Sequence, residues 1–111
     1  MIHVHFPPAA EEAMHVRVTG HAGTEAKGRD VVCSAVSTLL LTCLGGAEEV
    51  LAAEVTGQFE EGFCDVVLRV PKARKDHLRI VGEIFRHGFR KLAVTYPERV
   101  NLIEGGMHHG A

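Results

Sequence analysis

Hydrophobic and polar residues alternate along four segments of the chain, which is the period-two pattern of β-strands that bury one face. These segments are Ile2–Phe6, Met14–Thr19, Glu54–Glu60 and Cys64–Val70. A proline-containing connection joins the first two, and a glycine-rich stretch, Gly20–Gly28, follows the second. That stretch has no apolar periodicity, so we predict a flexible loop there.

The last two predicted strands are separated by Glu61-Gly62, a two-residue loop of the kind found in β-hairpins. With this loop, Phe59 pairs with Cys64 and Gly57 pairs with Val66. Both apolar sets then lie on one face, so the register agrees with the hydrophobic pattern. We therefore predict an antiparallel hairpin over these residues.

Two longer segments have the period of amphipathic helices. The first begins after Asp30, a good N-cap, and Gly45-Gly46 are expected to end or kink it before two further turns over Ala47–Ala53. The second covers Lys72–Tyr96, and Pro97 stops it. Their apolar stripes comprise Val32, Val36, Leu39, Leu40 and Cys43 in the first helix, and Leu78, Val81, Phe85, Phe89, Leu92 and Tyr96 in the second.

The order of elements is ββαββα, with a further short edge strand expected at Val100–Ile103. This order predicts an α+β fold of two layers, in which an antiparallel β-sheet carries both main helices on one face. The chain has 111 residues, of which 46% are hydrophobic, enough for a single core. We expect one domain over residues 1–104 and a flexible C-terminal tail over residues 105–111.

Composition and charge exclude several classes of function. The formal net charge of −2 argues against wholesale binding of nucleic acid, and 5% aromatic residues leave little for base stacking. The N-terminal residues lack a signal-peptide pattern, and we interpret the uncharged segment Val31–Ala47 as a buried helix rather than a membrane span. Three cysteines without a C-x-x-C pair suggest reduced thiols. We therefore expect a cytoplasmic protein without a membrane, metal or other cofactor.

Cys33 and His21 are the best candidates for chemistry. If Asp30 is the N-cap, Cys33 lies in the first helical turn, where unpaired backbone N–H groups and the helix dipole favour a thiolate. His21 follows a strand and precedes the glycine-rich loop that leads into this helix, so its imidazole can fold back beside the sulfur. A thiolate beside an imidazole is the core of a cysteine hydrolase. The plainer alternative is a buried helix cysteine and a turn histidine.

Other candidate features have simpler structural explanations. The segment Gly23–Asp30 has the glycine spacing of a phosphate loop but lacks the Lys-Ser/Thr that must follow. Cys43 and Cys64 lie on predicted core faces and are interpreted as packing residues. His3, His5 and His15 share the polar face of the first two strands, and the hairpin could bring His5 beside His15. Because the pattern places no carboxylate or fourth ligand, we interpret them as solvated residues.

The second helix carries a basic side. Between Lys72 and Lys91 there are seven Lys and Arg residues against two acidic ones. Most such faces are simply solvated, and the functional alternative is a weak contact with ribosomal RNA or the guidance of a partner.

The run from Gly20 to Ser37 resembles the signature of the bacterial ribosomal-processing cysteine proteases, the Prp family. That signature is G-H-A, five residues, then G-x-D-I-V-C-A-A-V-S. This chain departs from it at Val31 and Ser34. Chain length and element order agree with the family over residues 1–104.

The resemblance implies a cysteine endopeptidase, active as a cytoplasmic homodimer. Its substrate would be a large-subunit ribosomal protein, whose N-terminal extension is cut off after an aromatic residue during ribosome maturation. Cys33 would be the nucleophile and His21 the general base and acid, supported by Asp30 and Ser37. Gly20, Gly23 and Gly28 would belong to a flexible loop that orders over the bound peptide.

Two other classes of function remain as alternatives. A non-catalytic, dimeric, ribosome-associated binding module would keep the motif for loop packing; it would bind a peptide without cutting it. A thiol redox sensor is weaker, because no resolving cysteine is predicted near Cys33.

Overall fold

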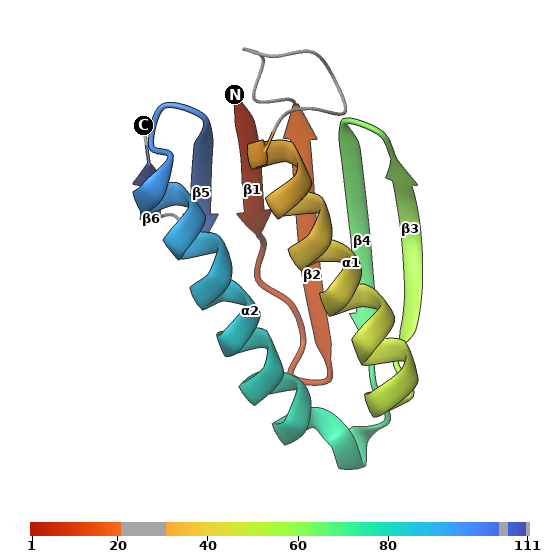
Figure 1. Cartoon of the computed structure of the whole chain (residues 1–111). Helices are drawn as coiled ribbons and strands as arrows, with labels where there is room; N and C mark the ends of the chain where they lie inside the picture. The colour runs from red at the N-terminus through yellow and green to blue at the C-terminus, as the bar shows by residue number, and fades with distance from the viewer. Residues whose placement is uncertain (21–30, 105–106, 111) are drawn as a thin grey trace.

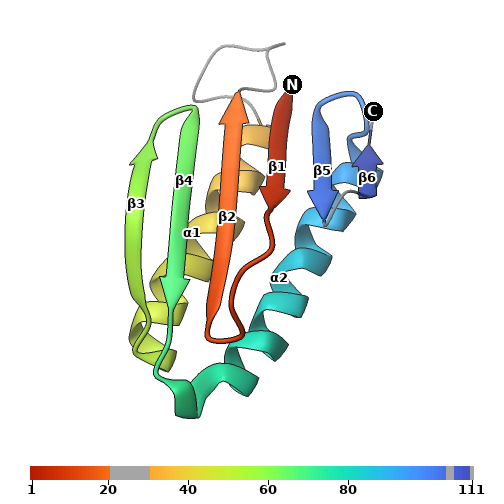
Figure 2. The ribbon, with the colours of Figure 1, turned by 180° about the vertical axis from the view of Figure 1, so that it is seen from behind.

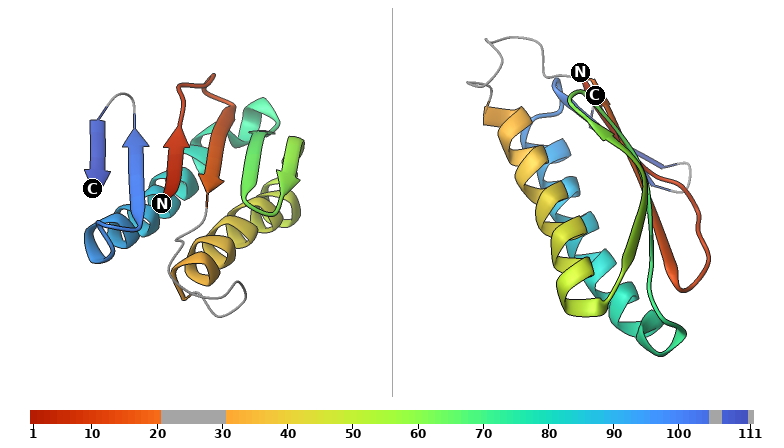
Figure 3. Two further views of the ribbon diagram at one scale, coloured as in Figure 1. Left: turned by 90° about the horizontal axis from the view of Figure 1, so that it is seen from above. Right: turned by 90° about the vertical axis from the view of Figure 1, so that its right-hand side faces the viewer.

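The structure is a computed structural model of the chain, and it describes residues 1–20, 31–104 and 107–110. Within these residues, a six-stranded sheet forms one layer and two helices lie side by side across one of its faces (Figures 1 and 3). The predicted α+β fold with two layers is therefore confirmed. The elements are β1 (Ile2–Phe6), β2 (Ala13–Gly20), α1 (Val31–Leu51), β3 (Glu54–Glu60), β4 (Phe63–Arg69), the short 3-10 helix η1 (Lys72–Arg74), α2 (Lys75–Thr95), β5 (Val100–Glu104) and β6 (Met107–Gly110).

The predicted hairpin is present with the predicted register. Phe59 pairs with Cys64 and Gly57 with Val66 in the antiparallel β3–β4 ladder. β4 then pairs with β2, which in turn pairs with β1. The two-residue loop and the hydrophobic pattern select the same register, since a slip of one residue would turn the buried side chains of β4 to the outer face.

The sheet is mixed, whereas the sequence analysis expected an antiparallel one. β5 runs parallel to β1, with Ile2 opposite Val100. The reason is the length of α2, which carries the chain back along the sheet to the end where β1 starts, as the view from behind shows (Figure 2). The sheet order is β3-β4-β2-β1-β5-β6, so β5 is also not an edge strand. Residues 107–110, expected in a flexible tail, form β6 against β5.

α1 continues through Gly45-Gly46, where the sequence analysis expected it to end or kink. Glycine costs a helix only about 1 kcal/mol relative to alanine, and buried residues on both sides of the pair, Cys43 and Ala47 among them, hold the helix on the sheet. It stops at Leu51, where Ala52 turns the chain with a left-handed φ of 56°. By length and composition α1 could cross a membrane, as core helices of soluble proteins also can, and here it buries seven residues.

The two faces of the sheet differ in chemistry. The face under the helices is apolar, and Phe6 meets Phe89 of α2 edge-on with ring centroids 5.6 Å apart. On the opposite face, Asp65 accepts hydrogen bonds from His15 at 2.6 Å and from Arg17 at 3.2 Å. The hydrogen bond from His15 is the main reason why the pKa of the Asp65 carboxyl lies below its ordinary value.

The histidines of the outer face do not meet as expected. In the β1–β2 ladder His5 stands opposite Arg17, not beside His15. In this register the position opposite His15 is residue 7, two residues beyond His5, so the two histidines are not paired. Among the described residues, there is no group of three or more metal-ligating side chains.

Two glycines provide a test of this backbone. Gly57 has a φ of 125°, and a Cβ there would lie 2.2 Å from the backbone oxygen of Asp65, whereas a Cβ at Gly45 would meet nothing within 4 Å. We expect Gly57→Ala to lower the free energy of unfolding by about 2 kcal/mol or more. Gly45→Ala should raise it by about 0.5–1 kcal/mol, because alanine favours a continuous helix. Urea unfolding measures both, and a destabilising Gly45→Ala would contradict the uninterrupted α1.

Candidate active site

Cys33 is the third residue of α1 and is partly exposed. The predicted placement in the first helical turn is therefore confirmed. The positive end of the helix dipole lies at this first turn, where it favours negative charge such as that of an oxyanion formed beside the thiol. α1 thus presents a nucleophilic atom at the helix end that is best suited to negative charge.

The other two thiols are chemically unsuited to nucleophilic attack. Cys43 is 2% exposed and Cys64 is 3% exposed, which confirms their prediction as packing residues. Burial raises the pKa of the Cys43 thiol to about 12, an effect that nearby Arg86 only partly offsets. Burial, and secondarily the charge of Asp65, raises the pKa of Cys64 to about 11. Both thiols are neutral at physiological pH, which leaves Cys33 as the candidate nucleophile.

β2 ends beside the start of α1. Its last residue, Gly20, pairs with Ile2 of β1 and donates its backbone N–H to the carbonyl of Gly62 at 3.0 Å. A Cβ on Gly20 would lie 2.2 Å from the carbonyl oxygen of Met1, so glycine is required for this close approach. Figure 1 shows that the end of β2 and the start of α1 lie at the same end of the sheet. The chain therefore leaves the sheet for His21 at the end where Cys33 lies.

Several sequence-predicted residues lie outside the described part of the chain, namely His21, Gly23, Gly28 and Asp30. Ser37 is described, and it is exposed one helical turn after Cys33. Residues four apart lie on the same side of a helix, so the Ser37 hydroxyl shares the side of α1 that carries the thiol.

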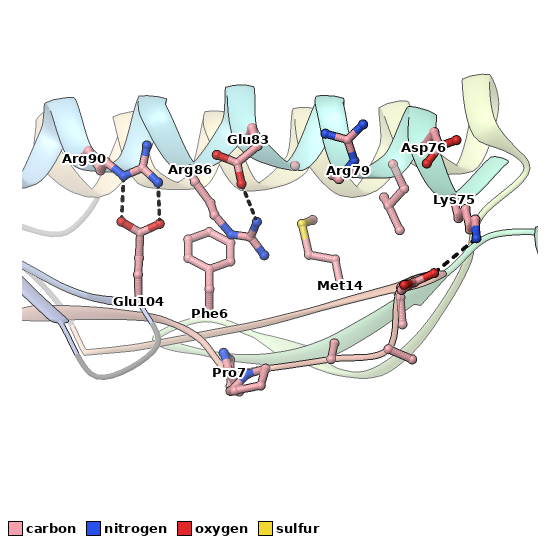
Figure 4. A pocket seen from close by; sticks show the side chains of 17 residues that line it. Phe6, Pro7, Met14, Lys75, Asp76, Arg79, Glu83, Arg86, Arg90 and Glu104 are labelled. Atoms are coloured by element: carbon pink, nitrogen blue, oxygen red, sulfur yellow. Dashed lines mark hydrogen bonds and ion pairs between the residues drawn. The ribbon is translucent and has the colours of Figure 1, made fainter.

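The basic side of α2 is more internally paired than the sequence suggested. Arg90 donates two hydrogen bonds to the Glu104 carboxylate, at 2.7 and 2.9 Å. Arg86 contacts Glu83 at 3.3 Å and lies over the Phe6 ring. These residues line a groove of about 590 Å³ between α2 and the connection from β1 to β2 (Figure 4).

Sequence reasoning missed both this groove and the partners of its cations. Arg90 and its partner Glu104 are 14 residues apart in the sequence. Lys75 contacts Glu11 at 3.2 Å, and these two residues are 64 positions apart. No local spacing indicates such pairs; only the fold brings them together.

The chain matches the sequence family described as "Cysteine protease Prp" over residues 1–101. No curated protein matches it. Among solved structures, SMU.848 from Streptococcus mutans is 29% identical, with a TM-score of 0.72 over 94% of this chain and 93% of that chain. The S. aureus ribosomal processing protease Prp with a covalently linked product peptide is 18% identical, with a TM-score of 0.76 over 94% of this chain and 99% of that one. The same protease with a substrate peptide gives 17% identity and a TM-score of 0.72 over the same shares.

The family match over residues 1–101, together with the partly exposed thiol at the start of α1, identifies the chain as a cysteine protease. The chain belongs to the Prp family of cysteine proteases, as the run from Gly20 to Ser37 indicated.

The difference between the three thiols predicts the order in which they react. A limiting amount of iodoacetamide at pH 7 should label Cys33 first, because the other two thiols are buried and their pKa values are raised. Peptide mapping by mass spectrometry identifies the labelled residue. The sequence analysis expects His21 beside the sulfur, and on that expectation His21→Ala should slow the labelling of Cys33. If Cys43 or Cys64 reacts first in the folded protein, the assignment of the nucleophile is wrong.

Proposed function

We propose that this protein is a cytoplasmic endopeptidase that removes the N-terminal extension of a large-subunit ribosomal protein. The observation that carries the proposal is the partly exposed thiol of Cys33 in the first turn of α1, within a chain of the Prp family. Further support comes from the S. aureus relative, a ribosomal processing protease that has been solved with substrate and product peptides.

The proposed reaction is acyl transfer through a thioester. The Cys33 thiolate attacks the carbonyl carbon of the scissile peptide bond, and backbone N–H groups at the start of α1 stabilise the oxyanion. His21 gives a proton to the leaving amine, the C–N bond breaks, and the new N-terminus departs. His21 then takes a proton from water, whose oxygen attacks the thioester carbonyl; the acid product leaves and the thiol is restored.

We assign supporting roles to the remaining motif residues. Asp30 caps α1 or pairs with a charge at the site, and Ser37 offers a hydroxyl on the Cys33 side of the helix. Gly20, Gly23 and Gly28 allow the segment between β2 and α1 to close over bound peptide. Such closure would complete the site only when substrate is present, which limits cleavage of other peptides.

The active form in this proposal is a homodimer. Several large apolar side chains outside the core support a contact between two copies of the chain, since exposed apolar surface of this kind marks interaction sites. They include Leu41 on α1 and Ile80, Ile84 and Val94 on α2, each more than half exposed. The contact with ribosomal RNA expected from the basic side of α2 has less support, because three of its cations are already paired with carboxylates.

The activity is tested with a peptide that spans the junction between the N-terminal extension and the rest of the ribosomal protein. Wild-type protein should cut it once, and Cys33→Ala should abolish the cut while the protein stays folded, because only one small side chain is lost. Cys33→Ser should also be nearly inactive, since an alcohol is far less acidic than a thiol. Mass spectrometry of the products measures this. Binding of the peptide by wild-type protein without any cleavage would instead favour the non-catalytic binding module.

Sedimentation equilibrium at micromolar concentration tests the dimer. We expect twice the chain mass of 12.1 kDa. Leu41→Glu should weaken association, because it places a charge in an apolar contact, whereas Glu49→Gln on the same helix should not. A clean monomer for the wild-type protein would refute the dimer without affecting the assignment of Cys33.

A further inference from the structure

The helix-facing side of β3 is only partly covered, since Val55 packs against the core while the rest of the strand is exposed. Phe59 is 46% exposed although it stands opposite Cys64, which is 3% exposed. Along β4 every second residue is buried, whereas no residue of β3 is buried. Val55, Gly57 and Phe59 therefore form an accessible apolar strip at the sheet edge, which we call the β3 ledge.

The diagonal course of α1 explains this exposure. The helix starts over β1 and β2 and ends near the opposite end of β3 and β4, as the front and back views both show (Figures 1 and 2). At the end of the sheet where Cys33 lies, α1 has therefore not yet reached β3. Phe59 is at that end, because it shares a cross-strand row with Cys64 and Val18, two residues before β2 ends.

Cys33 and Ser37 lie on the flank of α1 that faces the β3 ledge. Leu39 marks the flank toward α2, since its side chain lies closest to the Cβ position of Gly88. With 3.6 residues per turn, Cys33 points roughly 120° away from Leu39 and Ser37 roughly 160° away. α2 and β3 lie on opposite sides of α1 (Figure 1). The thiol of Cys33 is therefore turned toward the side of α1 on which the β3 ledge lies.

The ledge has the properties of a strand-binding surface. Among the described residues, no strand pairs with the outer edge of β3, so its backbone groups are available to an added strand. Gly57 must be glycine because of its φ of 125° and the nearby Asp65 oxygen. The strand therefore has no side chain at the position between Val55 and Phe59 on this face.

The charge of this edge specifies the occupant further. Glu54 and Glu60 stand at the two ends of β3, and the strand contains no Lys or Arg. Resting on the proposed function, we infer that the β3 ledge binds the substrate as an added strand. An aromatic side chain of the substrate packs against Phe59 beside Gly57, and flanking Lys or Arg residues lie near the two glutamates. Phe59 is then a specificity-determining residue of the protease.

The test measures binding without requiring cleavage. A fluorescein-labelled peptide that spans the extension junction is titrated into Cys33→Ala protein, alongside a second peptide with its aromatic residue replaced by Ala. Phe59→Ala, added to Cys33→Ala, should weaken binding of the aromatic peptide about tenfold, which corresponds to about 1.4 kcal/mol. It should change binding of the Ala peptide less than twofold, because the partner of Phe59 is absent there. Val50→Ala, which truncates an exposed apolar residue near the C-terminal end of α1, is the control and should alter neither.

Further measurements separate a binding role from a structural one. Phe59→Ala should leave the urea midpoint and the rate of Cys33 labelling unchanged, and in active enzyme it should raise KM without lowering kcat. If this variant does not fold, Phe59→Leu replaces it, with a smaller loss expected. Glu54→Gln with Glu60→Gln should reduce the salt dependence of binding.

Each adverse outcome overturns a distinct claim. If Phe59→Ala weakens binding of both peptides equally, Phe59 has a structural role. If it converts a dimer to a monomer, Phe59 contacts a second copy of the chain. In either case the β3 ledge would not be the substrate site. If wild-type protein fails to cut the junction peptide but Cys33→Ala binds it through Phe59, the proposed function is wrong while the binding surface stands.

Discussion

The packing of α1 against one face of the sheet is the interaction on which the rest of this structure depends. Seven buried side chains of α1 contribute to it, and each of the Val and Leu side chains among them stabilises the fold by roughly 1.5–3 kcal/mol. The same contact fixes the rotation of the helix. Because the stripe that includes Val36 and Leu40 faces the sheet, Cys33 is turned toward the flank rather than fully buried, and a thiol in the first turn stays accessible.

The diagonal of α1 across the sheet has a second consequence. One helix cannot cover four strands along their whole length. The direction of α1 therefore decides both which part of the sheet it buries and which part it leaves exposed. That open surface is at the Cys33 end, and it consists of an edge strand with an exposed aromatic residue. The substrate binding that we infer uses this edge, because backbone pairing with an added strand gives affinity and side-chain contacts give selectivity.

The charged residues are organised differently from the apolar ones. The sequence suggested that Arg86 and Arg90 belong to one solvated basic face, but Arg86 pairs with Glu83 on α2 and lies over the Phe6 ring, and Arg90 pairs with Glu104 of β5. The exposed pair between Arg86 and Glu83 contributes little to stability. Their effect is to lower the net positive potential of α2, which leaves the acidic edge of β3 as the more distinctive electrostatic feature of the molecule.

The sequence by itself determined the elements whose signals are local. Alternation placed the first four strands, the Glu61-Gly62 loop fixed the hairpin register, and the Gly20–Ser37 motif indicated both the family and the candidate nucleophile. Only the tertiary structure decided what depends on distant residues: the parallel pairing of β5 with β1, the continuity of α1 through Gly45-Gly46, and the exposure of Phe59. The physical reason is that these outcomes depend on packing between segments far apart in the chain, which overrides the weak preference of a single glycine and cannot be read from the spacing of residues within one segment.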